Sequence, residues 1–383
     1  MTKSTHFRMK NLSEDAYPLT WQVLRSGVET GVAPGVVAGL WSKKEPDCFF
    51  IAALGNRCVL PAAMPMLPDT VFDLSSVSKV FGTATLAAML VERKWIDWDT
   101  EIGSFFQQYL RSGIRVRHLL GHTAGFSAWE PFWQKMRHVL SVERIERVPV
   151  EERQRAMRDV VLNLKLLGRP GEHCVYSDIS FLILGFVLEE VTQMPLDRAV
   201  KTMLWDSMGI EGAFYKRVTK SVNEDTLDVA AATENCPWRG GVLQGQVHDD
   251  NCWAMGGYGG HAGAFASARE ILHFSKRLMM GFLTKETLNA MWSRIPEPPG
   301  CERTLGWDTP SGSDSATGRS FSPSSVGHLG FTGTSLWIDP GAEIAVVLLT
   351  NRVHPSRDNM KIKGFRPRFH DALRDDLARN IGN

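Results

Sequence analysis

The sequence predicts a mixed α/β fold in which an antiparallel sheet, flanked by helices, carries an inserted and mainly helical section. Three observations lead to this prediction. Two apolar segments that suit strands lie near the amino end, at residues 34–42 and 48–54. Two more lie near the carboxyl end, at residues 326–338 and 342–350. Between them, residues 94–296 have mainly the apolar spacing of helices, interrupted by glycine-containing loops.

The first elements follow from local signals. A helix is expected over residues 14–30, because Gly31 and then Pro34 come after it. The segments 34–42 and 48–54 are expected to pair across the polar turn at residues 43–47. The next element is a helix that begins near Ser76.

Near the carboxyl end, residues 304–308 are expected to return to strand, and residues 311–318 form a loop rich in serine and glycine. The segments 326–338 and 342–350 are expected to pair around the turn Asp339-Pro340-Gly341. A helix over residues 369–379 closes the chain.

Strands from both ends of the chain are therefore expected to share one sheet. This gives a sheet domain made of residues 1–93 and 298–383, and a mainly helical domain made of residues 94–297. The active site is expected in the cleft between them.

Composition sets broad limits. The chain has 383 residues, of which 43% are hydrophobic and 22% charged, with a net charge of +1. It is long enough for a large core, and its near-neutral charge gives no case for nucleic acid or a membrane surface as partner. The polar start, residues 1–10, lacks the apolar region of a secretory signal, so a cytoplasmic location is expected. The six cysteines show no C-x-x-C pair and are interpreted as mostly buried free thiols.

The most informative motif is Ser76-Val77-Ser78-Lys79, which precedes the apolar run at residues 84–90. The pattern predicts a helix with Ser76 in its first turn, so that Ser76 and Lys79 share one face. A serine hydroxyl becomes a good nucleophile when a nearby base takes its proton, and an amine in a partly dry pocket can take part in that step. We therefore expect Ser76 to be a nucleophile, against the alternative that it only caps the helix.

Two later segments complete a pattern. Tyr176-Ser177-Asp178 precedes the apolar run at residues 179–191, and His328-Leu329-Gly330 lies in a glycine-spaced strand. In this order the three segments resemble the serine β-lactamase and penicillin-binding-protein superfamily, in particular its class C-like branch with esterases and D-stereospecific peptidases. That superfamily brings S-x-x-K, Y-x-N and K-T-G or H-x-G motifs together in one cleft. The resemblance extends over about residues 34–357.

The resemblance implies a β-lactamase/transpeptidase-like fold and catalytic roles for Ser76, Lys79 and Tyr176. It also implies that the backbone amides of Ser76 and Phe331 form an oxyanion hole. Tyr176 matches the tyrosine that exchanges protons between nucleophile, leaving group and water. A phenol, with a pKa of about 10, needs a nearby positive charge to act as a base at neutral pH, and Lys79 would supply it. The alternative for Tyr176 is a packing aromatic.

Asp178 departs from the asparagine of the family. A carboxylate beside Lys79 would keep the amine charged and leave Tyr176 as the better base. Unlike an asparagine, it has no hydrogen-bond donor for a substrate carbonyl. Asp178 also begins the helix at residues 179–191, so we expect it to cap that helix, to contact the site, or to do both.

His328 and Leu329 stand where the family has lysine or histidine and then threonine or serine. The resemblance assigns Asp178, His328 and Gly330 to substrate binding. An imidazole is largely neutral at pH 7, and a leucine has no hydroxyl to donate. The two residues therefore favour a neutral ester, lactone or amide over a β-lactam or a peptide ending in D-alanine, unless Arg352 or Arg357 supplies a cation.

The remaining motifs give less information about function. His122 and His261 lie in glycine-rich turns and are expected to make structural hydrogen bonds. No H-E-x-x-H or comparable spacing occurs, and neither a metal nor a cofactor is expected. The chain has no G-x-S-x-G elbow, which argues against an α/β-hydrolase. A few of the tryptophans are expected to line an acyl pocket, and the others to lie in the core.

We therefore predict a cofactor-free serine hydrolase with an acyl-Ser76 intermediate, esterase- or lactonase-like and acting on a small neutral substrate. A penicillin-binding D-peptidase or amidase, or a β-lactamase, is the alternative enzyme. The non-enzymatic alternative is a homologue that binds a ligand with little or no turnover.

Overall fold

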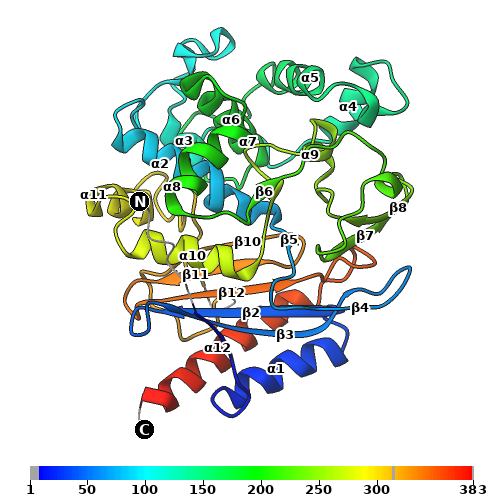
Figure 1. The fold of residues 1–383 in the computed structure, drawn as a ribbon. Helices are drawn as coiled ribbons and strands as arrows, with labels where there is room; N and C mark the ends of the chain where they lie inside the picture. Colours follow the sequence, from blue (N-terminus) through cyan, green and yellow to red (C-terminus); the bar gives the residue numbers. More distant parts are fainter. Residues whose placement is uncertain (1–7, 313–314, 382–383) are drawn as a thin grey trace, which may run out of the picture.

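The computed structural model describes residues 8–312 and 315–381, and its main feature is a seven-stranded sheet (Figure 1). The strand order is β1-β3-β2-β12-β11-β10, with β4 paired to β3. The β1–β3 pair is parallel and the other pairs are antiparallel. The strands are β1 Arg8–Asn11, β2 Gly35–Ser42, β3 Cys48–Cys58, β4 Met64–Pro65, β10 Val326–Leu329, β11 Ser335–Asp339 and β12 Ile344–Thr350.

The two ends of the chain meet in the middle of this sheet. β2 pairs with β12 over seven residues on each strand, from Val36 opposite Thr350 to Ser42 opposite Ile344. Every residue of β12 is buried, which fits a central strand covered on both faces. The prediction of a mixed α/β fold with one sheet built from both ends is confirmed.

Helices cover both faces of the sheet (Figure 1). α1 (Pro18–Glu29) and α12 (Ile362–Ile381) lie together on one face, over a core that includes Val346 and Phe369. α10 (Ala268–Met279) packs on the other face against β2 and β12. α10 comes from the section expected to be a separate helical domain, and its apolar residues join one continuous core with that face of the sheet. The division at residues 94–297 stays a prediction.

The inserted section is mainly helical, and it contains two small sheets. One has the order β5-β9-β6, and the other is the β7–β8 pair. α2 Thr85–Glu92 precedes this section, whose helices besides α10 are α3 Val116–Leu120, α4 Phe132–Val139, α5 Val150–Leu162, α6 Asp178–Thr192, α7 Leu196–Ala199, α8 Asp206–Met208, α9 Asp250–Ala254 and α11 Lys285–Trp292. β5 Phe72–Asp73 also precedes the section and pairs with its strand β9 Ala264–Ala266; the other strands of the section are β6 Phe214–Tyr215, β7 Ala232–Cys236 and β8 Gly241–Gln244.

The prediction of a single strand over residues 326–338 is wrong, because this segment forms two strands. β10 and β11 pair with each other across a turn at residues 330–334. Gly333 has a φ of 110°, which side chains rarely adopt. At Gly330, a Cβ atom would lie 2.0 Å from the Thr334 hydroxyl. Gly330 and Gly333, which the sequence predicts to lie inside one strand, are thus the residues that allow the turn.

Other expected bounds also shift. The first helix begins at Pro18 rather than at residue 14, and the last begins at Ile362 rather than at residue 369. Residues 304–308 form no strand, and only Asp308 makes an isolated bridge, to Gly327. Within the loop expected at 311–318, residues 313–314 lie outside the described part of the chain.

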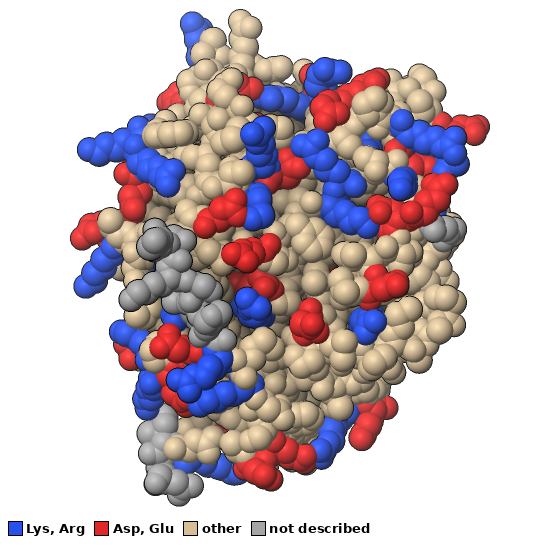
Figure 2. All heavy atoms as spheres, viewed as in Figure 1, with Lys and Arg blue, Asp and Glu red and all other residues tan. Residues whose placement is uncertain are grey.

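The surface shows no segregation of charge on the face in Figure 2, where cationic and anionic side chains are interspersed. In the described ranges, no single helix is long and apolar enough to cross a membrane. α6 and the helical segment Leu196–Met208 pass that test only as a pair, with a bend of 70° between them. α6 is largely buried in the core.

The contact between α1 and α12 gives a stability prediction. A Cβ atom at Gly27 would lie 2.4 Å from the ring of Phe365, which is itself buried. Gly27→Val should therefore separate the two helices and lower the free energy of unfolding by about 1–3 kcal/mol, as overpacking does. The measurement is a urea titration followed by circular dichroism.

Gly364→Ala is the matched control, because a Cβ atom there meets no heavy atom within 4 Å. Replacing a helical glycine by alanine should raise the free energy of unfolding by up to about 1 kcal/mol. Equal effects of the two substitutions would show that the approach of α1 to α12 is not close.

Candidate active site

Ser76 lies in a short helical turn at the edge of the sheet. A 3-10 turn over Ser75–Val77 leads into a π-helical segment over Lys79–Ala84 and then into α2. The expectation of a regular helix from Ser76 is therefore wrong in its local geometry. Lys79 Nζ nevertheless lies 2.9 Å from Ser76 Oγ. Leu74 holds the cap position of this turn, without a side-chain hydrogen bond, so Ser76 is not its cap.

Lys79 is the centre of the site. Its side chain is 0% exposed, and Nζ lies 2.7 Å from Asp178 Oδ1, 2.8 Å from the Tyr176 hydroxyl and 3.1 Å from the His261 carbonyl, besides Ser76. An ammonium has three N–H donors. Four acceptors therefore compete for three protons, and the two hydroxyls are the acceptors that can rearrange.

The charges of this cluster follow from burial and pairing. Burial opposes the charge on Lys79, but the Asp178 carboxylate and the Tyr176 oxygen outweigh that effect and raise the pKa of Lys79 above its ordinary value. Burial also raises the pKa of Tyr176, although the Lys79 ammonium acts in the opposite direction. The resting cluster therefore holds a charged amine, a charged carboxylate and a neutral phenol.

Asp178 contacts the site and does not cap α6. The cap is Ser177, whose hydroxyl accepts a hydrogen bond of 3.2 Å from the amide of Ser180. Asp178 is the first residue of α6, and its side chain turns to Lys79 instead. Of the two alternatives for Asp178, capping is wrong.

The turn at residues 330–334 is fastened to the turn that carries Ser76. Thr332 Oγ1 donates to the carbonyl of Asp73 at 2.8 Å, and Thr334 Oγ1 donates to that of Leu74 at 3.0 Å. The Phe331 amide, assigned to the oxyanion hole by resemblance, donates to Ser75 Oγ at 3.2 Å. A developing oxyanion is a stronger acceptor than this hydroxyl, so the amide is available to it.

Two arginines that sequence reasoning did not assign to this task hold the peptide planes of the turn. Arg352 Nε donates to the Phe331 carbonyl at 2.8 Å, and its guanidinium lies 4.4 Å from the centre of the Phe331 ring. Arg366 donates to the carbonyls of Gly330 and Thr334 at 2.9 and 2.8 Å. Fixing the carbonyl side of these peptides also fixes the direction of the Phe331 amide.

Ser75 is a further residue that the sequence did not reveal. It has a φ of 49°, in the left-handed region where a residue with a side chain is strained by about 1–3 kcal/mol. Its amide donates to Asp73 Oδ1 at 2.9 Å, and its hydroxyl accepts from Phe331. The strained residue thus links the Ser76 turn to the turn at residues 330–334.

His328 is buried, with 2% of its surface exposed, and its ring centre lies 5.9 Å from that of Tyr176. Its Nδ1 donates to the Leu329 carbonyl at 2.9 Å, and burial lowers its pKa to about 4. It is therefore neutral at pH 7. Gly330 also lines the site, and a Cβ atom there would lie 2.6 Å from the Leu74 carbonyl, so a glycine lets the two turns approach.

These residues line a cavity of about 530 Å³. Ser76, Tyr176, Asp178, His328 and Phe331 all contribute to its wall. Trp129 and Phe331 are exposed aromatic residues in this wall, with 47% and 48% of their surface accessible. Of the tryptophans in the described residues, Trp129 alone lines this cavity, where a few were expected, and an acyl pocket stays a prediction.

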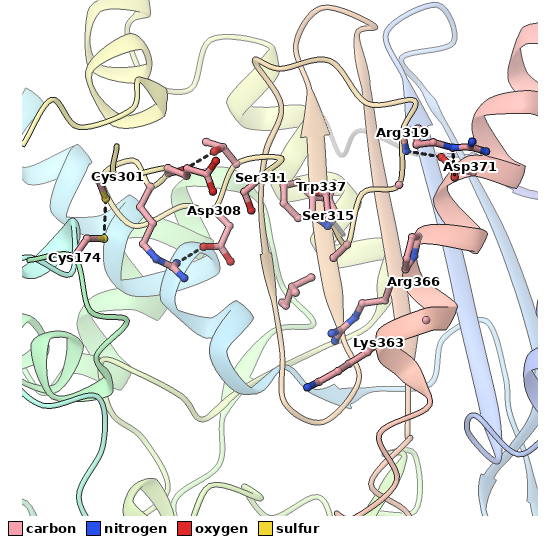
Figure 3. Close-up of a pocket in the computed structure, with 18 of the residues that line it drawn as sticks. Cys174, Cys301, Asp308, Ser311, Ser315, Arg319, Trp337, Lys363, Arg366 and Asp371 are labelled. Atoms are coloured by element: carbon pink, nitrogen blue, oxygen red, sulfur yellow. Dashed lines mark hydrogen bonds and ion pairs between the residues drawn. The ribbon is translucent and has the colours of Figure 1, made fainter. Parts of the chain in front are cut away.

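The cavity wall also carries cations. Arg357 is paired with Glu234 and Asp250, so it is neutralised. Arg352, Lys363 and Arg366 line the cavity, and within the described residues none of them makes an ion pair with a carboxylate. Lys363 and Arg366 were missed because the last helix was expected to begin after them. Figure 3 shows both projecting from α12 into the neighbouring cavity.

The two turn histidines make hydrogen bonds within the protein. His122 Nδ1 accepts from the Ser177 amide at 3.0 Å, and its ring centre lies 4.7 Å from that of Tyr176. His261 Nε2 lies 2.9 Å from Asp249 Oδ1, and its carbonyl accepts from Lys79. In the part of the chain that the structure describes, no group of three or more histidine, cysteine, aspartate or glutamate side chains is placed to hold a metal ion.

Comparison with known proteins identifies the fold. The Simvastatin Synthase (LovD) from Aspergillus terreus aligns with a TM-score of 0.69 at 16% identity, over 96% of this chain and 100% of its own. EstCE1, described as a hydrolase with promiscuous acyltransferase activity, aligns with a TM-score of 0.69 at 20% identity, over 94% and 99%. A β-lactamase from Mycobacterium bovis aligns with a TM-score of 0.58 at 19% identity, over 93% and 98%.

Sequence comparison gives the family. A protein from Salmonella agona named as a putative D-alanyl-D-alanine carboxypeptidase is 28% identical over 333 residues, which cover 77% of this chain and 72% of the relative. The family model described as Beta-lactamase matches residues 22–365, most of the chain. The resemblance inferred from three short motifs is thereby confirmed, and the chain belongs to the Beta-lactamase family of serine hydrolases.

Proposed function

We propose that this hydrolase forms an acyl-enzyme on Ser76 and acts on small neutral esters or lactones. One observation carries the proposal. A single buried amine, Lys79 Nζ, contacts both the Ser76 hydroxyl and the Tyr176 hydroxyl at the wall of a cavity large enough for a small substrate. This is the arrangement of a nucleophile with a proton-transfer partner.

The steps follow from the geometry. Ser76 Oγ attacks the carbonyl carbon, and its proton passes to the Lys79–Tyr176 pair. The amides of Ser76 and Phe331 stabilise the oxyanion. When the tetrahedral intermediate collapses, the bond to the leaving oxygen breaks and that oxygen takes the proton from the same pair. Water then repeats the attack on the acyl-Ser76 ester and releases the acid.

The resting charges decide which form of the enzyme reacts. A charged Lys79 has no free electron pair, and a neutral Tyr176 still holds its proton. One proton must therefore leave the pair before it can accept the proton of Ser76. The reactive form is scarce at neutral pH and becomes more abundant as pH rises.

The neutral substrate class rests on three groups at the cavity wall. His328 is uncharged at pH 7, Leu329 has no hydroxyl to donate, and the exposed rings of Trp129 and Phe331 offer apolar contact. A site of this kind favours an apolar acyl group over a substrate that must carry a charge into the cleft.

A second candidate is a hydrolase for substrates that bear a carboxylate, such as peptides ending in a D-amino acid. The observation in its favour is the cationic wall formed by Arg352, Lys363 and Arg366, without a carboxylate partner in the described ranges. The name of the Salmonella agona relative points in the same direction. Against it, Arg352 and Arg366 already donate to backbone carbonyls, which leaves Lys363 as the one of these three cations whose side chain has no partner among the described residues.

Ser76→Ala should abolish turnover of p-nitrophenyl butyrate and covalent labelling by a fluorophosphonate, with little change in melting temperature. Intact-protein and peptide mass spectrometry give the site of labelling. Ser78→Ala is the control, since Ser78 Oγ only accepts from the Ala264 amide, at 3.1 Å. It should keep the labelling. A probe that still attaches to the Ser76→Ala protein would refute the nucleophile, and a wild type that binds substrates without turnover would favour a binding role.

The proton-transfer pair gives a prediction about pH. Activity, as kcat/KM for p-nitrophenyl butyrate, should rise from pH 7 towards alkaline pH. Asp178→Asn removes a charge that raises the pKa of both Lys79 and Tyr176, so the rising limb should move to lower pH.

Ser177→Ala is the control for this shift, because it removes the cap of α6 and leaves the carboxylate in place. Its pH profile should keep the wild-type position even if the protein is less stable. A limb that stays fixed in the Asp178→Asn protein would show that neither Lys79 nor Tyr176 is the base.

The substrate class is tested by comparing kcat/KM for p-nitrophenyl butyrate with that for nitrocefin, which carries a carboxylate. Wild type should prefer the ester. His328→Lys with Leu329→Thr should shift the ratio towards nitrocefin by about tenfold to a hundredfold, the scale of one charged hydrogen bond. If wild type already prefers nitrocefin, and Lys363→Gln removes that preference, the second candidate replaces the first.

A further inference from the structure

Two of the six cysteines face each other. Cys48, Cys58, Cys236 and Cys252 are buried, whereas Cys174 and Cys301 are partly exposed. The sulfur atoms of Cys174 and Cys301 lie 2.7 Å apart, although the residues are 127 positions apart in the chain. The distance is shorter than the usual separation of unbonded sulfur atoms. The expectation of mostly buried thiols therefore holds for four of the six and leaves a facing pair.

The pair is accessible from a second cavity, of about 1000 Å³, which adjoins the candidate active site. Cys174 and Cys301 form one end of its wall, with Asp308 next to them (Figure 3). Arg303, Asp308 and Leu329 line both cavities, so the two are neighbours. A small thiol reagent in solvent can thus reach the sulfur atoms.

Both cysteines lie close in sequence to residues of the Tyr176 environment. Cys174 is two residues before Tyr176, and Cys301 is two residues before Arg303, which contacts the Tyr176 ring. Cys174 precedes Tyr176 in a segment held by hydrogen bonds from the Val175 amide to the His122 carbonyl and from the Ser177 amide to His122 Nδ1. Cys301 precedes Arg303, whose guanidinium lies 4.8 Å from the centre of the Tyr176 ring. A bond between the two sulfur atoms would join both segments beside this ring.

We propose that Cys174 and Cys301 form a reversible disulfide bond that ties the Tyr176 segment to the Arg303 segment and slows acylation of Ser76. A disulfide has an S–S distance of about 2.05 Å, so the sulfur atoms must approach by roughly 0.65 Å. That movement is small for two loops, but a shift of the same size at the Tyr176 hydroxyl would lengthen its 2.8 Å contact with Lys79 beyond the usual hydrogen-bond range. The effect on rate rests on the proposed function, whereas bond formation does not.

The oxidant is a small-molecule disulfide. One cysteine thiolate attacks it, forms a mixed disulfide and expels the first small thiolate; the second cysteine then attacks the mixed disulfide and expels the other. In balance, two protein thiols and one small disulfide give one protein disulfide and two small thiols. Burial raises the pKa of Cys174 to about 12, with a further contribution from Cys301, so exchange should be faster at higher pH.

The first experiment maps the bond in the full chain. The protein is incubated with glutathione disulfide at pH 8.5, blocked with N-ethylmaleimide, digested without reduction and analysed by mass spectrometry. The expected product is a Cys174–Cys301 cross-link that disappears with dithiothreitol and is absent from Cys174→Ala and Cys301→Ala. Cys48→Ala, which removes a thiol from β3, should retain it. Alkylation of both residues after oxidation would overturn the proposal.

The second experiment measures consequences. Closing a loop of this length should raise the melting temperature of the oxidised wild type by several degrees, and not that of Cys301→Ala. The melting temperature does not depend on enzyme activity, so it tests formation of the disulfide even if the proposed function is wrong. Oxidation should also slow fluorophosphonate labelling of wild type at least threefold, and leave Cys301→Ala unchanged. Equal labelling rates in the two redox states of wild type would overturn the proposal that the disulfide slows acylation of Ser76.

Discussion

The buried ion pair between Lys79 and Asp178 is the interaction on which the candidate site depends. A lone ammonium with no exposed surface would be strongly disfavoured, and removing one member of a buried pair costs about 3–5 kcal/mol. Lys79 comes from the segment before α2, Asp178 from the start of α6, and the second fixed acceptor of the ammonium is the carbonyl of His261. Three distant segments must therefore be in place before the amine can be buried with its charge.

The same ion pair explains the resting protonation states of Lys79 and Tyr176. A neighbouring carboxylate, where the family has an amide, holds the proton on Lys79 and leaves Tyr176 neutral. Lys79 already contacts the hydroxyls of Ser76 and Tyr176, so the proposed chemistry requires a redistribution of protons more than a movement of atoms. Burial provides the low dielectric in which such a small change in charge has a large effect.

The sheet supplies the other half of the site through the turn between β10 and β11. Hydrogen bonds from Thr332 and Thr334 fasten this turn to the backbone before Ser76, while Arg352 and Arg366 hold its carbonyls. The amides proposed as oxyanion donors thus lie between the central sheet and the helix core. The strained backbone of Ser75 is tolerated because so many contacts on both sides determine it.

The sequence by itself determined the fold class and the strand pair near the amino end, because apolar periodicity is a local property of the chain, while the resemblance of its motifs to a known family singled out Ser76, Lys79 and Tyr176. Only the tertiary structure decided that Ser177 caps α6 while Asp178 faces Lys79, that Arg357 is neutralised by Glu234 and Asp250, and that the segment at 326–338 turns back on itself. It also decided that Cys174 meets Cys301. Each of these outcomes is a competition between partners far apart in the chain, and residue type and local spacing do not encode the distances that settle it.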